Sequence, residues 1–452
     1  MVGPAELEAP TEVLDPVVPQ QRSSLLGKVF RGAGRTALVI MSVTVLAGSG
    51  YAWRGAQYLN NGIATTNVFD TAGSQPTDGA GAGLTAPTLT TDQNILLVGM
   101  DSRTDAHGNP LPASDFTMLN AGPDTGEMNT DTMILVHIPA GGGQATAISF
   151  PRDSYVQIAG GYGKHRLNSA FAYAYNAEKN QLRAQGHTDA AQIEVQAKES
   201  GRQNLVATIE NLIGDAVTIN RYAEVNLYGF YQLSEAVGGV QVCLKAATYD
   251  DQTHAHFPAG EQTVSGVQAL NFVRERHDLP GGDLDRIVRQ QVFLGALAKQ
   301  ILSAGTLASP SRLDGLISAV QSAVTISSGW DIFTFAQEMQ GLSSGAVQFL
   351  TIPTGGGITV GGADMLEVSQ SKVAQFVREL MTDGVTPAGA TSSADTPGAT
   401  TPTDTAADPT TPSTGSGAIG STGPTDTNGS DTTDTTADGS QVITADGTPC
   451  VN

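Results

Sequence analysis

The chain has 452 residues, with 23 Lys and Arg against 44 Asp and Glu, and its formal net charge at pH 7 is −21. So acidic a chain argues against nucleic acid as a partner, because phosphate backbones attract basic surfaces. The length allows two or three domains, but the composition is too uneven for the whole chain to be packed core.

An apolar run at residues 37–53 predicts a single transmembrane helix, at the lower limit of length for crossing a bilayer. Basic residues ahead of it predict that residues 1–36 are cytoplasmic and that the rest of the chain lies outside the cell membrane. A cleaved signal peptide is the alternative, although 36 residues ahead of the run are more than an ordinary n-region holds. The basic residues are Arg22, Lys28, Arg31 and Arg35.

Two segments have the composition of unfolded chain. Residues 54–93 are rich in Gly, Thr, Ala and Asn and predict a linker. Residues 384–452 contain eight Asp and no Lys or Arg, and they bury too little apolar surface to offset the entropy of ordering, so we expect a disordered acidic tail. Cys243 and Cys450 either form one disulfide that ties this tail to the folded domain or remain separate thiols.

Between these segments, residues 94–383 predict one α/β domain. Short β-branched runs predict strands, and strands this apolar are normally covered on both faces, so we expect an α-β-α arrangement. Strands are expected at 95–100, 132–138, 144–150 and 346–352. Helices are expected at 199–213, 228–237, 265–275, 285–303, 310–322, 330–342 and 369–382.

Charged residues stand at the ends of the first three predicted strands. Asp101 and Arg103 follow the first, Arg152 follows the third, and Asp131 directly precedes the second. Ligands of open α/β sheets bind at the carboxyl ends of strands. If the second strand runs antiparallel to the first, Asp131 meets Asp101 at one edge, and beside a phosphate ligand this pair favours Mg²⁺ (or Mn²⁺). The alternative is that each aspartate caps a turn.

Farther along, Arg274, Arg276, Arg286 and Arg289 fall within sixteen residues. A guanidinium matches phosphate oxygens two at a time, so arginines concentrated in an acidic chain indicate a phosphate-bearing ligand. The alternative is a salt-bridged helix surface, because acidic residues share the stretch. A helix from residue 285 would place Arg286, Arg289 and Gln290 on one face.

Arg274 and Arg276 differ by two positions, so they cannot share the face of a regular helix. They can point into one site only if the helix from residue 265 ends there. The sequence HDLPGG that follows makes this ending expected.

Five segments together resemble, in order and spacing, the motifs of the LytR-CpsA-Psr family: NILLVGMDSR, MNTDTMILVHI, ISFPRDSYVQI, HRLNSAF and FVRERHDLPGGDLDRIVRQQ. Members of that family are membrane-anchored, extracytoplasmic enzymes that transfer a glycopolymer from a polyprenyl-pyrophosphate carrier to peptidoglycan and leave a phosphodiester link. The end of the chain, with its final PCVN, resembles actinobacterial members, which favours arabinogalactan as the glycan and a teichoic-type polymer as the second candidate. A polyprenyl-pyrophosphate phosphatase and a noncatalytic, membrane-tethered receptor for glycans or lipid carriers remain alternatives.

The resemblance also implies roles for the candidate residues. Asp101 and Asp131 would position magnesium, and Asp283 would orient an arginine or assist the acceptor hydroxyl. The proton acceptor is left open between Asp101, Asp153 and Asp283. Catalytic roles fall on Asp101, Asp131, Arg274, Arg276 and Asp283. Contacts to the pyrophosphate fall on Arg103, Arg152, Arg166, Arg286 and Gln290, with a weaker claim for Arg289.

Overall fold

The computed structural model describes residues 62–69, 89, 91–102, 104–106, 108–109, 111–119, 128–141, 143–250, 255–275, 279–301, 310–332, 334–335, 338, 347–383, 434–435, 441–444 and 449–452. The predicted cytoplasmic segment 1–36 and transmembrane helix 37–53 lie outside these residues. None of the helices that are described is long and apolar enough to cross a membrane.

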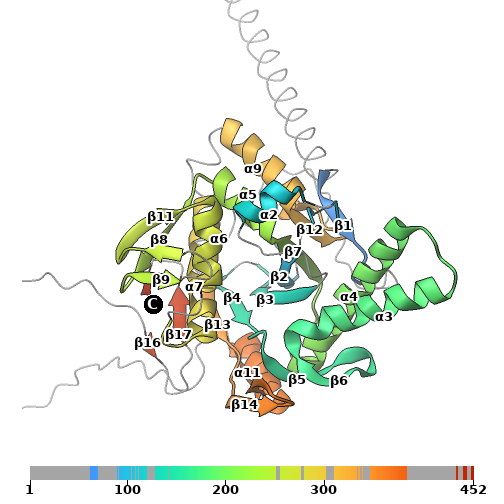
Figure 1. The fold of residues 1–452 in the computed structure, drawn as a ribbon. Helices are drawn as coiled ribbons and strands as arrows, with labels where there is room; N and C mark the ends of the chain where they lie inside the picture. Colours follow the sequence, from blue (N-terminus) through green and yellow to red (C-terminus); the bar gives the residue numbers. More distant parts are fainter. Residues whose placement is uncertain are drawn as a thin grey trace, which may run out of the picture. The chain divides into compact units, whose positions relative to one another are not determined.

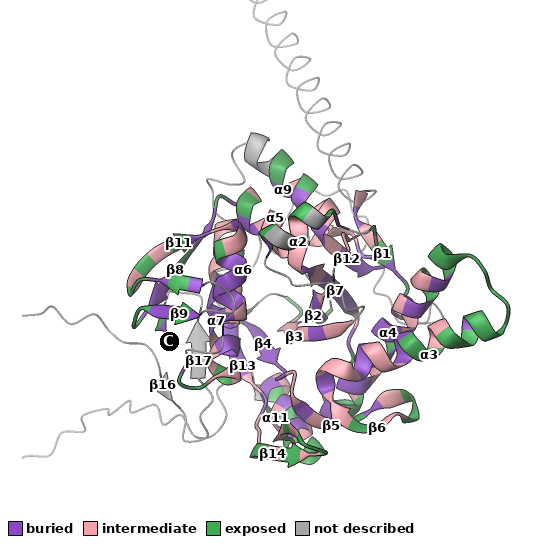
Figure 2. Ribbon diagram, in the orientation of Figure 1, coloured by how far each residue is buried: buried purple, intermediate pink, exposed green. Residues whose placement is uncertain are grey.

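Within the described residues, nine strands form a mixed sheet in the middle of the domain, in the order β1-β12-β7-β2-β3-β4-β13-β17-β16 (Figure 1). β4 is buried at every position, which fits a strand covered on both faces (Figure 2). The strands are β1 (Ala64–Thr66), β2 (Gln93–Asp101), β3 (Asn129–Ile138), β4 (Ala145–Ser149), β7 (Arg221–Asn226), β12 (Val324–Ser327), β13 (Val347–Thr351), β16 (Asp434–Thr435) and β17 (Gln441–Thr444).

Helices cover both faces of this sheet, which confirms the α-β-α prediction. Alternate residues of β2 face opposite sides of the sheet: Leu96 belongs to the apolar cluster that includes Ile209 of α4, whereas Leu97 packs against the cluster that includes Phe293 of α7. One face carries α4 (Ala190–Ile213) and α11 (Gln370–Asp383), with α3 (Ala170–Ala184) packed on α4. The other face carries α5 (Leu227–Ala236), α6 (Gly266–Arg274) and α7 (Asp283–Ile301), and the described helices also include α2 (Ala113–Met118) and α9 (Pro310–Ala323).

Local chemistry sets the ends of these helices. The Asp189 side chain accepts hydrogen bonds from the first turn of α4, and the Asn226 side chain accepts one from Gly229 N at 2.7 Å at the start of α5. α6 stops at Arg274 because Glu275 is extended, with ψ 137°. The helix from 265 therefore ends where the sequence predicted.

Smaller sheets flank the domain. A four-stranded sheet has the order β14-β15-β5-β6, a three-stranded sheet the order β11-β8-β18, and β10 pairs with β9. The strands are β5 (Ser154–Ile158), β6 (Gly163–Arg166), β8 (Val240–Leu244), β9 (Thr248–Asp250), β10 (Ala255–Phe257), β11 (Gly260–Val264), β14 (Gly356–Val360), β15 (Ala363–Glu367) and β18 (Cys450–Val451).

The expected linker, residues 54–93, contributes to the fold. Its residues 64–66 form β1, which pairs with β12 in parallel, and Gln93 opens β2. The domain therefore begins before residue 94. Three residues are too few to show the alternation by which a strand is recognised in sequence.

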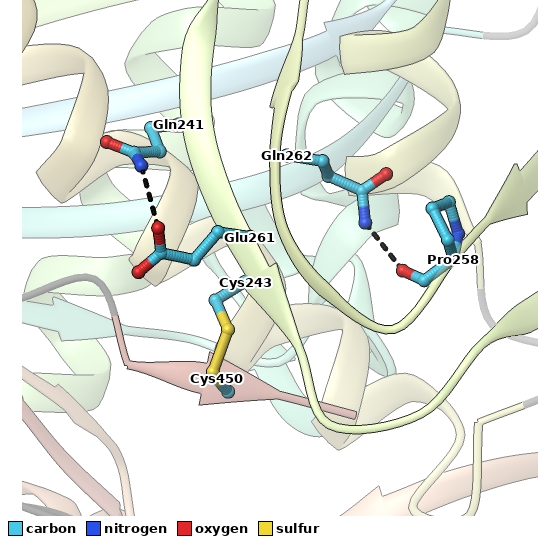
Figure 3. Close-up of a disulfide and its surroundings, with 6 residues drawn as sticks. All are labelled: Gln241, Cys243, Pro258, Glu261, Gln262 and Cys450. Atoms are coloured by element: carbon cyan, nitrogen blue, oxygen red, sulfur yellow. Dashed lines mark hydrogen bonds between the residues drawn. A yellow bond between two sulfur atoms is a disulfide. The ribbon is translucent and has the colours of Figure 1, made fainter. Parts of the chain in front are cut away.

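The expected disordered tail, residues 384–452, also contributes strands: β17 pairs with β13 and β18 pairs with β8. A disulfide joins Cys450 to its register partner Cys243, with 4.3 Å between the two Cα atoms (Figure 3). The disulfide alternative is confirmed, and disorder is wrong for these short strands. The average composition of residues 384–452 gave no indication of these strands, because short runs of strand-forming residues such as QVIT are surrounded by Thr and Gly.

Candidate active site

A cavity of about 500 Å³ lies between the sheet and the layer of α5, α6 and α7. Charged and polar residues line it where strands and helices end: Asp101 closes β2, Arg152 follows β4, and Arg274 closes α6. Apolar residues farther along the same elements line the rest, such as Leu97 on β2 and Leu297 on α7. The predicted site residues in the lining are Asp101, Asp131, Arg152, Arg274, Arg286 and Gln290.

A β-bulge brings Asp131 to the cavity. β2 and β3 are antiparallel, the condition under which Asp131 was expected to meet Asp101, but Gly99 pairs with Thr132 whereas Met100 pairs with Thr130. Asp131 is the extra residue of β3, and a bulge of this kind turns a side chain away from its regular direction. Asp101 and Asp131 consequently line the same cavity.

Arg152 is the centre of the charged end. Its Nη1 donates to Asp131 Oδ1 at 2.7 Å, and its Nε lies 3.6 Å from both Asp153 Oδ2 and Asp283 Oδ1. Burial lowers the pKa of Arg152, but the three carboxylates outweigh this effect and raise the pKa above its ordinary value. The guanidinium is thus a fixed cation, and within the described part of the chain its Nε donates no hydrogen bond.

The first turn of α7 joins this centre. Asp283 Oδ1 lies 2.6 Å from Arg286 Nη2, so Asp283 bridges Arg286 and Arg152. Its predicted part in orienting an arginine agrees with these distances. Gln290, one turn later, donates from Nε2 to Val273 O at 3.1 Å and so ties α7 to the last turn of α6.

Arg166 lies next to the site and is not part of the cavity lining. It ends β6, its Nε is 3.4 Å from Asp153 Oδ1, and its Nη2 donates to Asp364 O at 2.7 Å. Asp153 therefore links Arg166 to Arg152. The predicted pyrophosphate contact Arg103 and the predicted catalytic residue Arg276 lie outside the described residues.

Arg289 does not share the cavity face of α7, so the prediction of one face for Arg286, Arg289 and Gln290 is wrong. It is fully buried and pairs with Glu275. Adjacent helical residues are about 100° apart, so Arg289 and Gln290 face different surroundings. The spacing in the sequence was therefore not enough to show which side of the helix each residue faces.

The two cavity carboxylates suit magnesium. Mg²⁺ is usually held by one or two protein carboxylates, with the remaining ligands from phosphates and water. The described residues contain no group of three or more His, Cys, Asp or Glu side chains able to hold a metal ion alone. Asp101 and Asp131 therefore fit a cation whose remaining ligands come from a bound phosphate group.

Sequence reasoning did not identify the apolar half of the cavity. These apolar residues recur along helices and strands with the same spacing as core residues, so the sequence pattern cannot distinguish cavity-lining residues from core residues. Asn226 also lines the cavity. The sequence marks it only as an Asn ahead of an apolar helical run, which indicates a helix N-cap and not a binding residue. Phe230, Leu233, Leu270, Val273, Phe293 and Leu294 are the main apolar residues supplied by the helices, in addition to Leu297.

Comparison with known proteins relates this chain to one family. The model of the LytR_cpsA_psr family matches residues 66–382. The cell wall biosynthesis protein LcpA of Corynebacterium glutamicum is 42% identical over 71% of this chain and 59% of its own length. The polyisoprenyl-teichoic acid–peptidoglycan teichoic acid transferase TagU of Bacillus cereus is 27% identical over 51% of this chain and 59% of its own length.

Among solved structures, the LytR-Csp2A-Psr enzyme from Actinomyces oris aligns with a TM-score of 0.45 and 18% identity, over 68% of this chain and 96% of that chain. The chain spans 53% to 59% of the length of the corynebacterial relatives that it matches, LcpA and LcpB. The family match covers most of the folded domain, including the strands and helices that line the cavity. This chain belongs to the LytR-CpsA-Psr family.

Proposed function

We propose that this protein transfers a glycopolymer from a polyprenyl-pyrophosphate carrier to peptidoglycan and leaves a phosphodiester link. The observation that carries the proposal is a single cavity with two kinds of lining. Arg152, Arg274 and Arg286 suit the oxygens of a diphosphate, and the apolar residues from the sheet and from α5–α7 suit an isoprenoid chain. An amphiphile with a diphosphate head matches both halves.

In the proposed reaction, a hydroxyl oxygen of peptidoglycan attacks the phosphorus that bears the glycan. The bond from this phosphorus to the bridging oxygen breaks, and its electron pair leaves with polyprenyl phosphate. The hydroxyl proton passes to a carboxylate, for which Asp101, Asp153 and Asp283 are the candidates. The arginines stabilise charge on the phosphoryl oxygens and hold the two reactants in line.

Magnesium belongs to this proposal, with Asp101 and Asp131 as its protein ligands. When bound, it would neutralise negative charge on the pyrophosphate. Arg152 already neutralises Asp131 at 2.7 Å, which keeps the carboxylate in position. A test for the ion is loss of activity in EDTA and recovery on adding Mg²⁺ or Mn²⁺.

The proposed location is the outer face of the cell membrane, with residues 37–53 as the anchor and the cytoplasm on the side of residues 1–36. The Cys243–Cys450 disulfide supports an oxidising compartment, because cytosolic thiols are normally kept reduced. The glycan proposed is arabinogalactan, with a teichoic-type polymer as the competitor. Supplying both lipid-linked polymers to one preparation would show which is used.

The proposal is tested with the full-length chain in detergent, lipid-linked glycan, Mg²⁺ and purified peptidoglycan. We expect glycan covalently attached to the wall material and polyprenyl phosphate in the lipid fraction. Glycan phosphate released into solution would instead indicate a phosphatase in which water replaces the sugar hydroxyl. Lipid bound but left intact, equally by wild type and by Asp101→Ala, would indicate a receptor.

A further inference from the structure

Arg289 and Glu275 form a fully buried ion pair between α7 and the end of α6. The side chains of both residues are 0% exposed, and neither residue lines the cavity. A buried ion pair adds little stability compared with apolar residues of the same size, because both charges lose their hydration. Stability alone is thus a weak explanation for the pair.

Contacts from three segments hold the pair. The Arg289 guanidinium lies 5.0 Å from the ring centroid of Phe272 on α6, and its Nε donates to the backbone oxygen of Asn452, next to β18. Glu275 accepts a hydrogen bond from Thr248 Oγ1 on β9 at 3.1 Å. The positions of both charged groups are therefore strongly constrained.

The sequence neighbours of the two paired residues line the cavity. Glu275 directly follows Arg274, and its extended backbone (φ −56°, ψ 137°) sends neighbouring side chains in different directions. Glu275 turns into the buried pair whereas Arg274 lines the cavity. On α7, Arg289 points to the pair while Arg286 and Gln290 line the cavity. The ion pair thus joins the two segments on the side away from the cavity.

We propose that Arg289 and Glu275 are positioning residues, which fix Arg274 on α6 relative to Arg286 on α7 so that both meet the same diphosphate. This inference rests on the proposed transferase function. Phosphoryl transfer depends on the placement of cations around the phosphorus, and a shift of about 1 Å can cost roughly 100-fold in rate. Neither residue of the pair lines the cavity, so neither touches the lipid-linked glycan itself.

The test is the double variant Glu275→Met/Arg289→Met, which removes both charges and keeps similar volume. We expect the variant to fold, because apolar replacement of a buried pair is tolerated. We expect kcat to fall by about tenfold or more, with KM for the lipid-linked glycan changed by less than about threefold. Turnover, KM and the melting temperature would be measured on the full chain.

A second variant guards against misfolding of the first. Arg289→Lys keeps the charge facing Glu275 but loses the planar fork that also reaches Asn452, and we expect a smaller fall in kcat. The control is Lys179→Met/Glu194→Met, which removes an ion pair of 3.1 Å between α3 and α4, outside the cavity lining, and should leave kcat unchanged.

Full turnover in every folded variant of the pair would overturn the inference while leaving the proposed function intact. The same holds if the double variant unfolds and Arg289→Lys is fully active. A lower melting temperature together with a lower kcat that returns to the wild-type value when turnover is assayed at a lower temperature would also overturn it. The pair would then act only on stability. Absence of transfer by the wild type would instead overturn the proposed function, and this inference with it.

Discussion

Among the individual residues of the site, the cavity arginines come from different elements. Arg152 has three carboxylates within 3.6 Å, and Arg286 has Asp283 at 2.6 Å. Arg274 comes from α6 and donates to the backbone oxygen of Leu119 at 3.4 Å. Its replacement leaves the ion pairs around Arg152 in place, so Arg274 offers the sharpest test of the site.

Arg274→Ala should lower turnover by about 100-fold or more while the domain stays folded, because a guanidinium that stabilises phosphoryl charge is worth several kcal/mol. Turnover would be measured by glycan transfer and folding by circular dichroism. Arg183→Ala, on the last turn of α3, is the matched control and should behave as wild type. Transfer at the wild-type rate in folded Arg274→Ala protein would show that this arginine has no part in catalysis.

His137 predicts how stability depends on pH. It lies on β3 at the far end from the cavity, its Nδ1 is 2.7 Å from Asn94 Oδ1, and Asp92 and Asp215 line the same polar pocket. Burial lowers the pKa of His137 below its ordinary value of 6.5, with a smaller opposing effect from Asp92. The unfolded chain therefore takes up a proton first as the pH falls, and proton uptake by the unfolded state favours unfolding.

We expect the melting temperature to fall as the pH drops through about 6.5 towards the folded pKa, and to change less at higher pH. His137→Gln should weaken this dependence, because the amide has no proton to gain. Melting curves of both proteins between about pH 5 and pH 8 provide the measurement. Parallel curves would show that other groups control the transition.

Between helices and strands, buried polar contacts hold the helices against the sheet and against one another. Arg202 of α4 donates to both carboxylate oxygens of Glu224 on β7, at 2.8 and 3.0 Å, and to Thr66 Oγ1 on β1 at 3.2 Å. This contact explains why a strand as short as β1 joins the sheet. Helix α7 divides its polar residues between two environments, since Arg286 and Gln290 line the cavity whereas Arg289 is buried against Glu275.

Small residues on the sheet leave space in the cavity for the isoprenoid chain of the proposed carrier. Ala223 of β7 pairs with Leu97 of β2, and both line the cavity. Ala223→Phe should fill part of it and raise KM for a long polyprenyl carrier by about tenfold or more, since each buried methylene is worth about 0.8 kcal/mol. A carrier with a short chain should be affected less.

Ala177→Phe, at an exposed position of α3, is the control for this substitution. Kinetics with carriers of two chain lengths distinguish the outcomes. An equal effect on both carriers would mean that Ala223 does not border the chain.

Across the molecule as a whole, one covalent bond closes the C-terminal part of the domain into a loop. The disulfide joins Cys243 to Cys450 across 207 residues, and the loop encloses α6, α7 and β13. β18 lies beside β8 in the same place, where Gln241 also donates to Glu261 at 3.3 Å (Figure 3). The end of the chain is therefore part of the folded domain.

Cys450→Ser should lower the free energy of unfolding by about 2–5 kcal/mol, because a long loop gains entropy in the unfolded chain when it is opened. Urea denaturation with and without reductant measures the loss. The reductant should destabilise the wild type by a similar amount and leave the variant unchanged. A variant as stable as the oxidised wild type would show that pairing of β18 needs no covalent link.

Several features could be predicted from the sequence because they depend on neighbouring residues. The apolar strands, the helix ending at Arg274 and the clustering of Asp101 with Arg152 follow from local patterns and strand direction. The helix predicted from residue 285 also forms, although it begins two residues earlier, at Asp283. The family resemblance rests on the same local motifs, and the family match confirms it.

Other features depend on contacts between distant segments, and no local pattern announces them. The bulge that turns Asp131, the pairing of β1 with β12 and the pairing of β18 with β8 each require a partner far along the chain. Glu275 is only 14 residues from Arg289, and acidic residues in this stretch made ion pairing an expected alternative, but the burial of the pair depends on contacts with Thr248 and Asn452. The cavity itself is of this kind, because apolar residues facing a space have the same pattern as apolar residues facing one another. Local sequence is thus enough to specify the helices, the strands and the charged groups at their ends. Which of those ends meet is a property of the packed domain, because contacts between distant segments set the direction of each side chain.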